Sequence, residues 1–344
     1  MDKENNGLIV FFTGPMFSGK SERLLETINC LYTKSNNKIT ENDILAIKPK
    51  LDERDKNYIK SRNKNLNPIQ CVQDEKLNLG LLLKNNNKKI IVIDEVQFFQ
   101  NEQEDLQNIL LELQKAGKIV LIAGLDRISN GKTWKLYDAI KSLEDKNKDE
   151  DKDNVVIIHG KAICDITGLE AEYSAKVAIG EGITKTDIQM QGDNKIEYYP
   201  ICKEYFDLQE IIEKEYNEYY QQGVKNHQEI MISLRKCRNT FNTYEQNRTE
   251  TIDKITAEGK EIVNNVVKSI IIRLGLELEL SDDYSNTASN KEKQSYNIEL
   301  MRKLNKCKSE MTEVENSFYY NTPLSSSEQS TYLFNNSVKR SLTL

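Results

Sequence analysis

The sequence predicts an α/β fold in which helices cover both faces of a parallel sheet. Three observations support this prediction: apolar runs of strand length alternate with amphipathic stretches, a glycine-rich motif follows the first run, and an acidic pair ends a later one. Alternation of strand and helix is typical of parallel sheets, because each crossover between parallel strands needs a long connection. Such folds bind ligands at the carboxyl ends of their strands, where both motifs lie.

Five short apolar runs, mostly of β-branched residues, are the predicted strands. In chain order they are residues 7–12, 43–47, 89–93, 118–123 and 155–159. Helical spacing is found in residues 21–32 and 106–115. Residues 143–154 (LEDKNKDEDKDN) contain almost no apolar side chain, so we expect a solvated loop or insertion there.

The composition of the 344 residues argues against several classes of protein. A net charge of −6 and a pI near 5.4 leave no broad basic field, so neither nucleic acid nor an anionic membrane is expected as a partner. No run approaches the roughly 18 apolar residues of a membrane span, and the N-terminus lacks the features of a signal peptide. Six scattered cysteines are unlike a disulfide framework. We therefore expect a cytoplasmic protein.

The strongest motif matches G-x-x-x-x-G-K-[ST] and stands between a predicted strand and a predicted helix. It consists of Gly14, Pro15, Met16, Phe17, Ser18, Gly19, Lys20 and Ser21. Backbone N–H groups of such a loop hold phosphates together with the positive end of the helix. Lys20 would neutralise the β- and γ-phosphates of ATP, and Ser21 Oγ would bind Mg²⁺. The alternative is a glycine-rich turn that occurs by chance.

Two further groups of charged residues follow predicted strands. Asp94 and Glu95 end the run at 89–93, where Asp94 suits the magnesium shell and Glu95 could take a proton from an attacking hydroxyl. Asp52 and Arg54 follow the run at 43–47, and an arginine there could stabilise a transferring phosphoryl group. Ordinary charged turns remain the alternative for both groups.

Four segments together resemble the type II, cytosolic-type thymidine kinases. They are GPMFSGKS, KPxxDxR, DEVQFF and GLD, and the resemblance runs from about residue 7 to residue 206. It implies a RecA-like P-loop kinase domain (1–160) and a small zinc-ribbon-like domain with a substrate-covering lasso loop (161–206). It also implies ATP, Mg²⁺, a homotetramer, and transfer of phosphate to the 5′-hydroxyl of thymidine, giving dTMP and ADP for nucleotide salvage and DNA synthesis.

The resemblance carries over to individual positions of this sequence. Glu95 occupies the position of the family's general base, and Arg54 that of a residue that stabilises charge in the transition state. Gln97 occupies a position beside the nucleotide. The residues that would surround or contact the thymine base are Met16, Phe98, Leu125, Trp134, Ser174 and Tyr198. Without the family, the apolar and aromatic members of this set would be interpreted as core residues. Deoxyuridine is a plausible second substrate.

Two segments depart from the family pattern. The family binds zinc with two C-x-x-C/H pairs, but here the pairs are Cys164 with Thr167 and Cys202 with Tyr205. A structural zinc ion takes four nitrogen or sulfur ligands, so we predict that zinc is lost. The loop at 128–134 differs as well, because Ser129 replaces one aromatic wall and Trp134 enlarges another, which leaves nucleoside specificity open.

Residues 207–344 resemble nothing familiar and form a predicted C-terminal extension. Apolar spacing predicts two or three amphipathic helices, in residues 208–224 and 252–276, and a polar, flexible terminus from residue 280. Tyrosines 216, 219 and 220 are expected to pack on a neighbouring helix, and the extension favours self-association. Two alternative functions stay open: an ATPase or kinase of another nucleoside, and a non-catalytic nucleotide-binding protein whose tail mediates interactions.

Overall fold

The computed structural model describes residues 7–84, 87–149, 154–178 and 196–276, all within one compact unit. The predicted flexible terminus from residue 280 lies outside the described residues, as does part of the predicted loop at 143–154. Within the described part of the chain, no helix is both long and apolar enough to cross a membrane.

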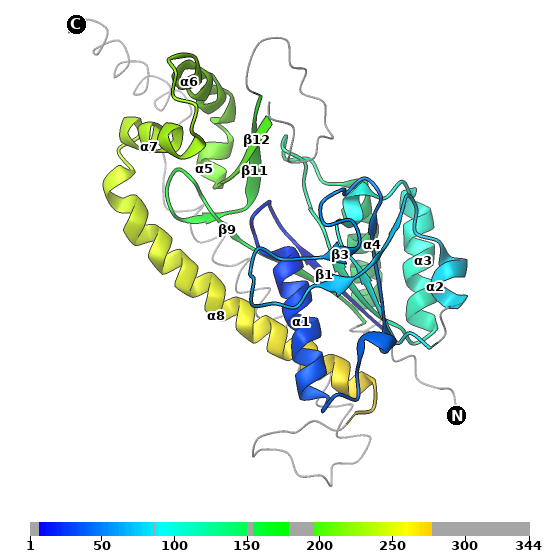
Figure 1. The fold of residues 1–344 in the computed structure, drawn as a ribbon. Helices are drawn as coiled ribbons and strands as arrows, with labels where there is room; N and C mark the ends of the chain where they lie inside the picture. The colour runs from blue at the N-terminus through cyan, green and yellow to red at the C-terminus, as the bar shows by residue number, and fades with distance from the viewer. Residues whose placement is uncertain (1–6, 85–86, 150–153, 179–195, 277–344) are drawn as a thin grey trace, which may run out of the picture. The chain divides into compact units, whose positions relative to one another are not determined.

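The centre of the structure is a six-stranded sheet whose strands all run parallel (Figure 1). In spatial order the strands are β5 (Val72–Asp74), β2 (Ile44–Pro49), β6 (Ile90–Ile93), β7 (Ile119–Ala123), β1 (Leu8–Thr13) and β8 (Val155–His159). All five predicted strands are confirmed, and their apolar side chains are buried. β5 was not predicted, because this edge strand is three residues long and lacks an apolar run. The α/β class with a parallel sheet is therefore confirmed.

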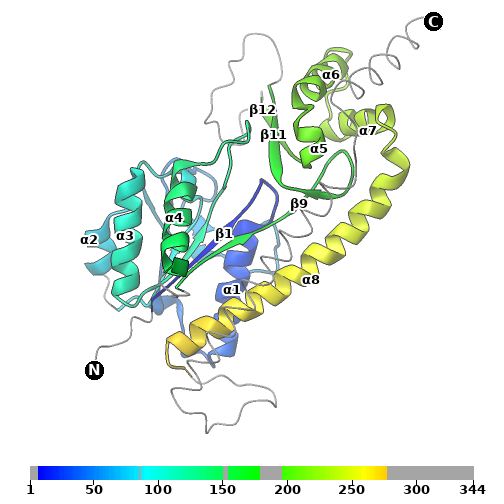
Figure 2. The ribbon, with the colours of Figure 1, turned by 180° about the vertical axis from the view of Figure 1, so that it is seen from behind.

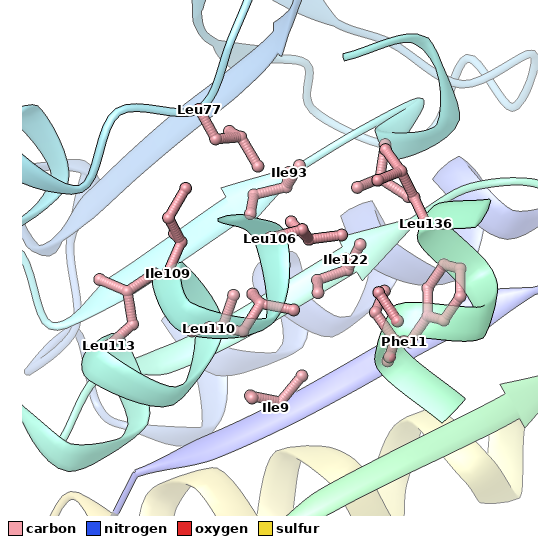
Figure 3. Close-up of a cluster of buried hydrophobic side chains, with 14 of the residues drawn as sticks. Ile9, Phe11, Leu77, Ile93, Leu106, Ile109, Leu110, Leu113, Ile122 and Leu136 are labelled. Atoms are coloured by element: carbon pink, nitrogen blue, oxygen red, sulfur yellow. The ribbon is translucent and has the colours of Figure 1, made fainter. Parts of the chain in front are cut away.

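Helices cover both faces of this sheet (Figures 1 and 2). One face carries α2 (Leu79–Lys84), α3 (Gln103–Lys115) and α4 (Lys135–Asp149); the other carries α1 (Lys20–Lys34) and, beyond it, α8 (Phe241–Arg273). Figure 3 shows the packing on the α3 side, where strand side chains such as Ile9, Ile93 and Ile122 meet Leu106 and Leu110 of α3. This core holds the carboxyl ends of the strands in fixed relative positions.

The predicted loop at 143–154 is wrong over its first half, because α4 continues to Asp149. Leu143 is buried in the core, and Glu144 is buried beside it. The Glu144 carboxylate accepts a hydrogen bond from the backbone N–H of Ile157 at 3.1 Å, which satisfies the buried charge. A long charged run is normally solvated, so the sequence pattern alone did not reveal this contact.

A second group of strands follows the sheet. It contains two antiparallel pairs, β9 (Ala162–Ile163) with β10 (Glu170–Ala171) and β11 (Tyr173–Ala178) with β12 (Ile196–Ile201), followed by α5 (Lys203–Phe206). A further hairpin, β3 (Tyr58–Ile59) with β4 (Ile69–Gln70), and the 3₁₀ turns η1 (Glu41–Asp43) and η2 (Val96–Phe98) lie in the loops of the main sheet.

The two helices placed in the C-terminal extension are confirmed as α6 (Gln209–Gln221) and α8, although α8 begins at Phe241, before the predicted start at residue 252. A third helix, α7 (His227–Cys237), lies in a segment where no helix was placed. α6 and α7 share one apolar core with the small strand pairs, including Tyr199, Ile201 and Ile212. Tyr216 and Tyr219 face α7 as predicted: their hydroxyls lie 3.1 Å from His227 Nδ1 and 3.2 Å from Cys237 Sγ.

The 33-residue helix α8 runs along α1, the helix that follows the glycine-rich motif (Figures 1 and 2). Lys34 Nζ of α1 donates to Asn264 Oδ1 of α8 at 2.6 Å. At the end of α8, Arg273 Nη1 donates to Asn154 Oδ1 at 2.8 Å. The extension therefore packs directly on the element that carries the phosphate-binding motif.

Candidate active site

The glycine-rich motif forms the loop between β1 and α1, and its backbone shape requires glycine. Gly14 has φ 129°, and a Cβ at this position would overlap the carbonyl oxygen of Gly160. Gly19 and Phe17 also have positive φ values, of 74° and 67°. Lys20 Nζ donates to the carbonyl oxygen of Pro15 at 2.7 Å, so the ammonium group lies across the mouth of the loop.

Burial lowers the pKa of Lys20, and the nearby carboxylates of Glu95, Asp126 and Asp94 oppose that shift. These carboxylates come from the ends of β6 and β7. An ammonium group at this position is suited to hold an anion that enters the loop.

Asp94 lies directly behind Ser21, at the end of β6. Ser21 Oγ donates to Asp94 Oδ1 at 2.9 Å, and the backbone N–H of Glu95 donates to the same oxygen at 3.0 Å. Burial and the neighbouring Glu95 carboxylate raise the pKa of Asp94 to about 7, while the Ser21 hydrogen bond acts in the opposite direction. The structure thus brings together the hydroxyl and the carboxylate that the sequence suggested for Mg²⁺.

Glu95 is held by two side chains from different loops. Arg54 Nη2 donates to Glu95 Oε1 at 2.6 Å, and Gln97 Nε2 donates to Glu95 Oε2 at 2.6 Å. Asp52 Oδ1 accepts from Arg54 Nε at 2.8 Å and so orients the guanidinium. Burial lowers the pKa of Arg54, but the hydrogen bond to Asp52 and the charge of Glu95 outweigh it, and the net shift is upward.

A cavity of about 270 Å³ opens in front of these groups. Twelve of the residues predicted to act in binding or catalysis line it: Ser174 and Tyr198, together with Met16, Phe17, Gly19, Lys20, Ser21, Arg54, Glu95, Phe98, Leu125 and Trp134. Ser174 and Tyr198 reach it from β11 and β12. The remaining predicted residues lie outside its lining: Gly14, Pro15 and Ser18 in the loop, with Asp94 and Gln97 behind Ser21 and Glu95.

The far wall of this cavity is aromatic and apolar. The rings of Phe98 and Trp134 meet edge to face, with centroids 6.1 Å apart. Leu125 is positioned by its backbone N–H, which donates to Gln97 Oε1 at 3.0 Å. Ser174 Oγ accepts the backbone N–H of Met16 at 2.7 Å, which ties β11 to the phosphate loop. A flat base fits between such walls.

Three basic residues that sequence reasoning missed also line the cavity: Lys60, Arg62 and Arg127. The guanidinium of Arg127 stacks over the Tyr173 ring at 4.9 Å, and that of Arg62 over the Phe17 ring at 4.6 Å. Arg127 could have been found, because it directly follows the GLD segment at the end of β7. No sequence signal marks Lys60 or Arg62, which come from the irregular loop around β3.

The four positions that correspond to zinc ligands come together, but their chemistry does not fit zinc. The thiols of Cys164 and Cys202 hydrogen-bond to each other, and Thr167 hydrogen-bonds to Cys164. The neighbouring Cys164 sulfur and burial raise the pKa of Cys202. Two of the four positions supply no usual zinc ligand. His159 instead faces Asp126, with its Nδ1 3.8 Å from Asp126 Oδ2.

The loop that contains Cys164 is held by the C-terminal extension. Arg235 Nε donates to the carbonyl of Asp165 at 2.7 Å, Thr240 Oγ1 to that of Ile166 at 2.8 Å, and Asn247 Nδ2 to that of Thr167 at 2.9 Å. Three consecutive carbonyls are thus satisfied from α7, α8 and the turn between them.

The family model and three curated relatives that match this chain are all named thymidine kinase. A family model described as thymidine kinase matches residues 7–206. The thymidine kinase of Ureaplasma urealyticum serovar 10 is 31% identical over 178 residues, which cover 51% of this chain and 71% of the relative. The thymidine kinase of Ureaplasma parvum serovar 3 is 29% identical over 200 residues, which cover 57% of this chain and 81% of the relative.

A thymidine kinase of Mycoplasma genitalium is 29% identical over 164 residues, covering 48% of this chain and 68% of the relative. Among solved structures, the Legionella pneumophila ATPase DotB matches with a TM-score of 0.27 and 14% identity over 80% of this chain and 58% of its own; a likeness this distant carries no argument. The family match ends at residue 206, so α6, α7 and α8 lie beyond it.

Proposed function

This chain belongs to the thymidine kinase family and phosphorylates thymidine with ATP, and from that premise we propose how its residues carry out the transfer. One observation supports the proposal above all others. The phosphate loop meets the acidic strand end, with Ser21 Oγ 2.9 Å from Asp94 Oδ1, and both face a cavity that Glu95 lines. A donor on the loop and an acceptor in the cavity would therefore meet beside Glu95.

The donor phosphates would lie on the loop from Gly14 to Ser21. Lys20 would exchange the Pro15 carbonyl, its acceptor at 2.7 Å, for phosphate oxygens. The Ser21 hydroxyl and the Asp94 carboxylate are hard oxygen ligands that fit Mg²⁺. Bound there, Mg²⁺ would neutralise charge on the β- and γ-phosphates. Gln97 would contribute indirectly, because its side chain holds Glu95.

Glu95 would accept the proton of the thymidine 5′-hydroxyl while the 5′-oxygen forms a bond to the γ-phosphorus. The bond between that phosphorus and the β-bridging oxygen breaks, and dTMP and ADP result. Arg54, now paired with Glu95 at 2.6 Å, lies where it can stabilise charge on the transferred group. Most of the acceleration would come from positioning and charge stabilisation, because phosphoryl transfer has a loose transition state.

The base would lie between Phe98 and Trp134 on one side and Met16, Leu125 and Tyr198 on the others. Apolar walls favour the thymine methyl group, and deoxyuridine, which lacks it, would be a weaker second substrate. One missing methyl group in an apolar pocket changes specificity by about 10- to 200-fold. Ser129, at the edge of this cavity, leaves more room than an aromatic residue would.

We further propose a RecA-like kinase domain at 1–160, a small zinc-ribbon-like domain at 161–206 and an extension at 207–344. The small domain would function without zinc, because only Cys164 and Cys202 remain as ligands. A homotetramer is expected from the family, and light scattering coupled to size exclusion measures it directly.

The test incubates the purified full chain with labelled ATP, Mg²⁺ and a panel of nucleosides. We expect dTMP as the main product, with deoxyuridine converted less efficiently. Preferred labelling of another nucleoside would mean that the 128–134 loop has changed specificity. ATP hydrolysis without nucleotide formation would indicate an ATPase, and ATP binding without turnover would indicate a non-catalytic protein.

A further inference from the structure

A second and larger cavity, of about 600 Å³, lies on the other side of the phosphate loop. It is lined by that loop, by α1, by β9 and β12, and by α8. Phe17, Gly19, Glu22, Arg62 and Tyr198 line both cavities, so the two meet at the phosphate loop. A volume of about 300–1,000 Å³ is typical of sites for small organic ligands.

Two buried polar groups in this lining have no partner among the described residues. The Arg23 side chain, 8% exposed, has neither a hydrogen bond nor an ion pair there, although Glu22, Glu26 and Glu258 lie near enough to act electrostatically. Ser18 Oγ is likewise buried without a hydrogen bond. Buried polar groups are nearly always paired, and an unpaired guanidinium is costly. Both groups therefore indicate a ligand with oxygen acceptors.

Arg23 is held in place by two glycines from different parts of the chain. A Cβ on Gly160 would overlap Arg23 Nη1, and a Cβ on Gly259 of α8 would lie 3.3 Å from Arg23 Nε. Glycine inside a helix costs up to about 1 kcal/mol relative to alanine. Gly259 allows α8 to pass directly over the guanidinium, so α8 packs closely against the loop end of α1.

The lining of this cavity also includes apolar side chains. Ile252 and Ile255 of α8 are three residues apart and share one face of the helix, and both are half-buried in the lining. Ala162 and Pro200 line the same cavity from β9 and β12. Charged side chains, among them Glu197 and Arg248, complete the lining. Apolar surfaces together with a few polar groups suit a nucleoside, which has apolar ring faces and polar edges.

We propose that this cavity holds the nucleoside half of the donor ATP and that α8 forms one of its walls. The inference rests on the proposed function, because phosphates on the loop fix where the nucleoside begins. The phosphate chain would leave the loop near Gly19 and Glu22, which line both cavities, and Arg23 and Ser18 would meet its oxygens. A helix beyond residue 206, outside the family match, thereby becomes part of the donor site.

The test measures ADP and pyrophosphate binding to the full chain by calorimetry. Pyrophosphate occupies only the phosphate loop, whereas ADP also needs the cavity. Ile255→Trp fills the cavity and is expected to weaken ADP binding about tenfold while leaving pyrophosphate binding unchanged. Thr256→Trp, at an exposed position of the same lining, should act in the same direction. Ala257→Trp, exposed on α8 but outside the lining, should change neither affinity.

Several outcomes would overturn the inference. Unchanged ADP binding in both cavity variants would show that the nucleoside lies elsewhere, and equal weakening of ADP and pyrophosphate would show a structural effect on the loop. ADP that still binds under saturating pyrophosphate would reveal a separate nucleotide site. Failure of the proposed function is a different result: the unmodified chain would then form no dTMP, whatever the variants bind.

Discussion

Glu95 is the general base in the proposed mechanism. Its backbone has φ 51° and ψ 44°, a left-handed conformation that costs a non-glycine residue about 1–3 kcal/mol. Strain of this kind persists only where the surroundings compensate for it, and here Arg54 and Gln97 bind both carboxylate oxygens. The conformation lets the side chain line the acceptor cavity while Asp94 stays buried behind it.

Replacing Glu95 with Gln is expected to lower kcat by about 10²-fold or more, because the amide cannot accept the 5′-hydroxyl proton. ATP binding should stay unchanged, since Lys20 and Ser21 are untouched. Steady-state kinetics and ATP titration of the variant check both parts. Turnover at the level of the unmodified enzyme would exclude Glu95 as the base.

Ser174 offers a second prediction at this scale. Its hydroxyl accepts the backbone N–H of Met16 at 2.7 Å, so Ser174→Ala leaves that donor without its acceptor. We expect a loss of about 1–3 kcal/mol in the free energy of unfolding and a higher KM for thymidine. Ser174→Thr keeps the hydroxyl and is the matched control. Equal stability of the Ala and Thr variants in urea would contradict the role of this bond.

Among the elements, α7 and α8 hold the loop that contains Cys164. Arg235, Thr240 and Asn247 bind three consecutive carbonyls beside Cys164, and α6 and α7 complete the core of the small strand pairs. Fixing this loop matters for function, because β11 and β12 bring Ser174 and Tyr198 to the cavity. The extension therefore packs against the strands that contribute Ser174 and Tyr198 to the smaller cavity.

Thr240→Val tests whether the extension stabilises the loop that contains Cys164, because valine has nearly the same shape as threonine but no hydroxyl. The hydroxyl of Thr240 makes no helix-capping bond but donates to the Ile166 carbonyl at 2.8 Å. Its removal should lower the free energy of unfolding by about 1 kcal/mol. Thr249→Val, at an exposed position of α8, is the control and should change stability by less than about 0.5 kcal/mol. If the two variants unfold at the same urea concentration, the hydrogen bond from Thr240 to the Ile166 carbonyl does not stabilise the fold.

At the scale of the whole molecule, we expect an enzyme whose folding does not depend on zinc. Metal analysis of the purified chain should find far less than one zinc per chain, and a chelator selective for zinc, with Mg²⁺ kept in excess, should leave both activity and Tm unchanged. The double variant Thr167→Cys with Tyr205→Cys provides the control, since it supplies four thiols at the positions that come together here. That variant should bind zinc and become sensitive to the chelator. Loss of activity when the unmodified chain meets this zinc-selective chelator in excess Mg²⁺ would show that zinc is retained.

Five strands of the main sheet could be predicted because most of their side chains are buried. β8 was predicted to the residue, since VVIIH is continuous, apolar and β-branched. β5 was missed because an edge strand with exposed Val72 has no such pattern. The helix through residues 143–149 was missed because its stability depends on a contact between Glu144 and β8, which no local pattern encodes.

Much of the acceptor cavity could also be predicted, because its residues lie in motifs that resemble a known family. Lys20, Glu95 and Trp134 were placed in this way, and all three line the cavity. Arg62 was missed because it comes from an irregular loop, and the pairing of Arg54 with Glu95 was missed because it joins residues 41 positions apart.

The sequence by itself determined five of the six strands of the sheet, the phosphate loop and the acidic pair, since each lies in or directly after a contiguous segment of apolar or glycine-rich pattern. Only the tertiary structure decided where the C-terminal extension lies: α8 passes over Arg23 through Gly259 and lines the larger cavity. The physical reason is that an amphipathic pattern shows which face of a helix is buried but not what covers it. That partner is set by close packing between residues more than 200 positions apart.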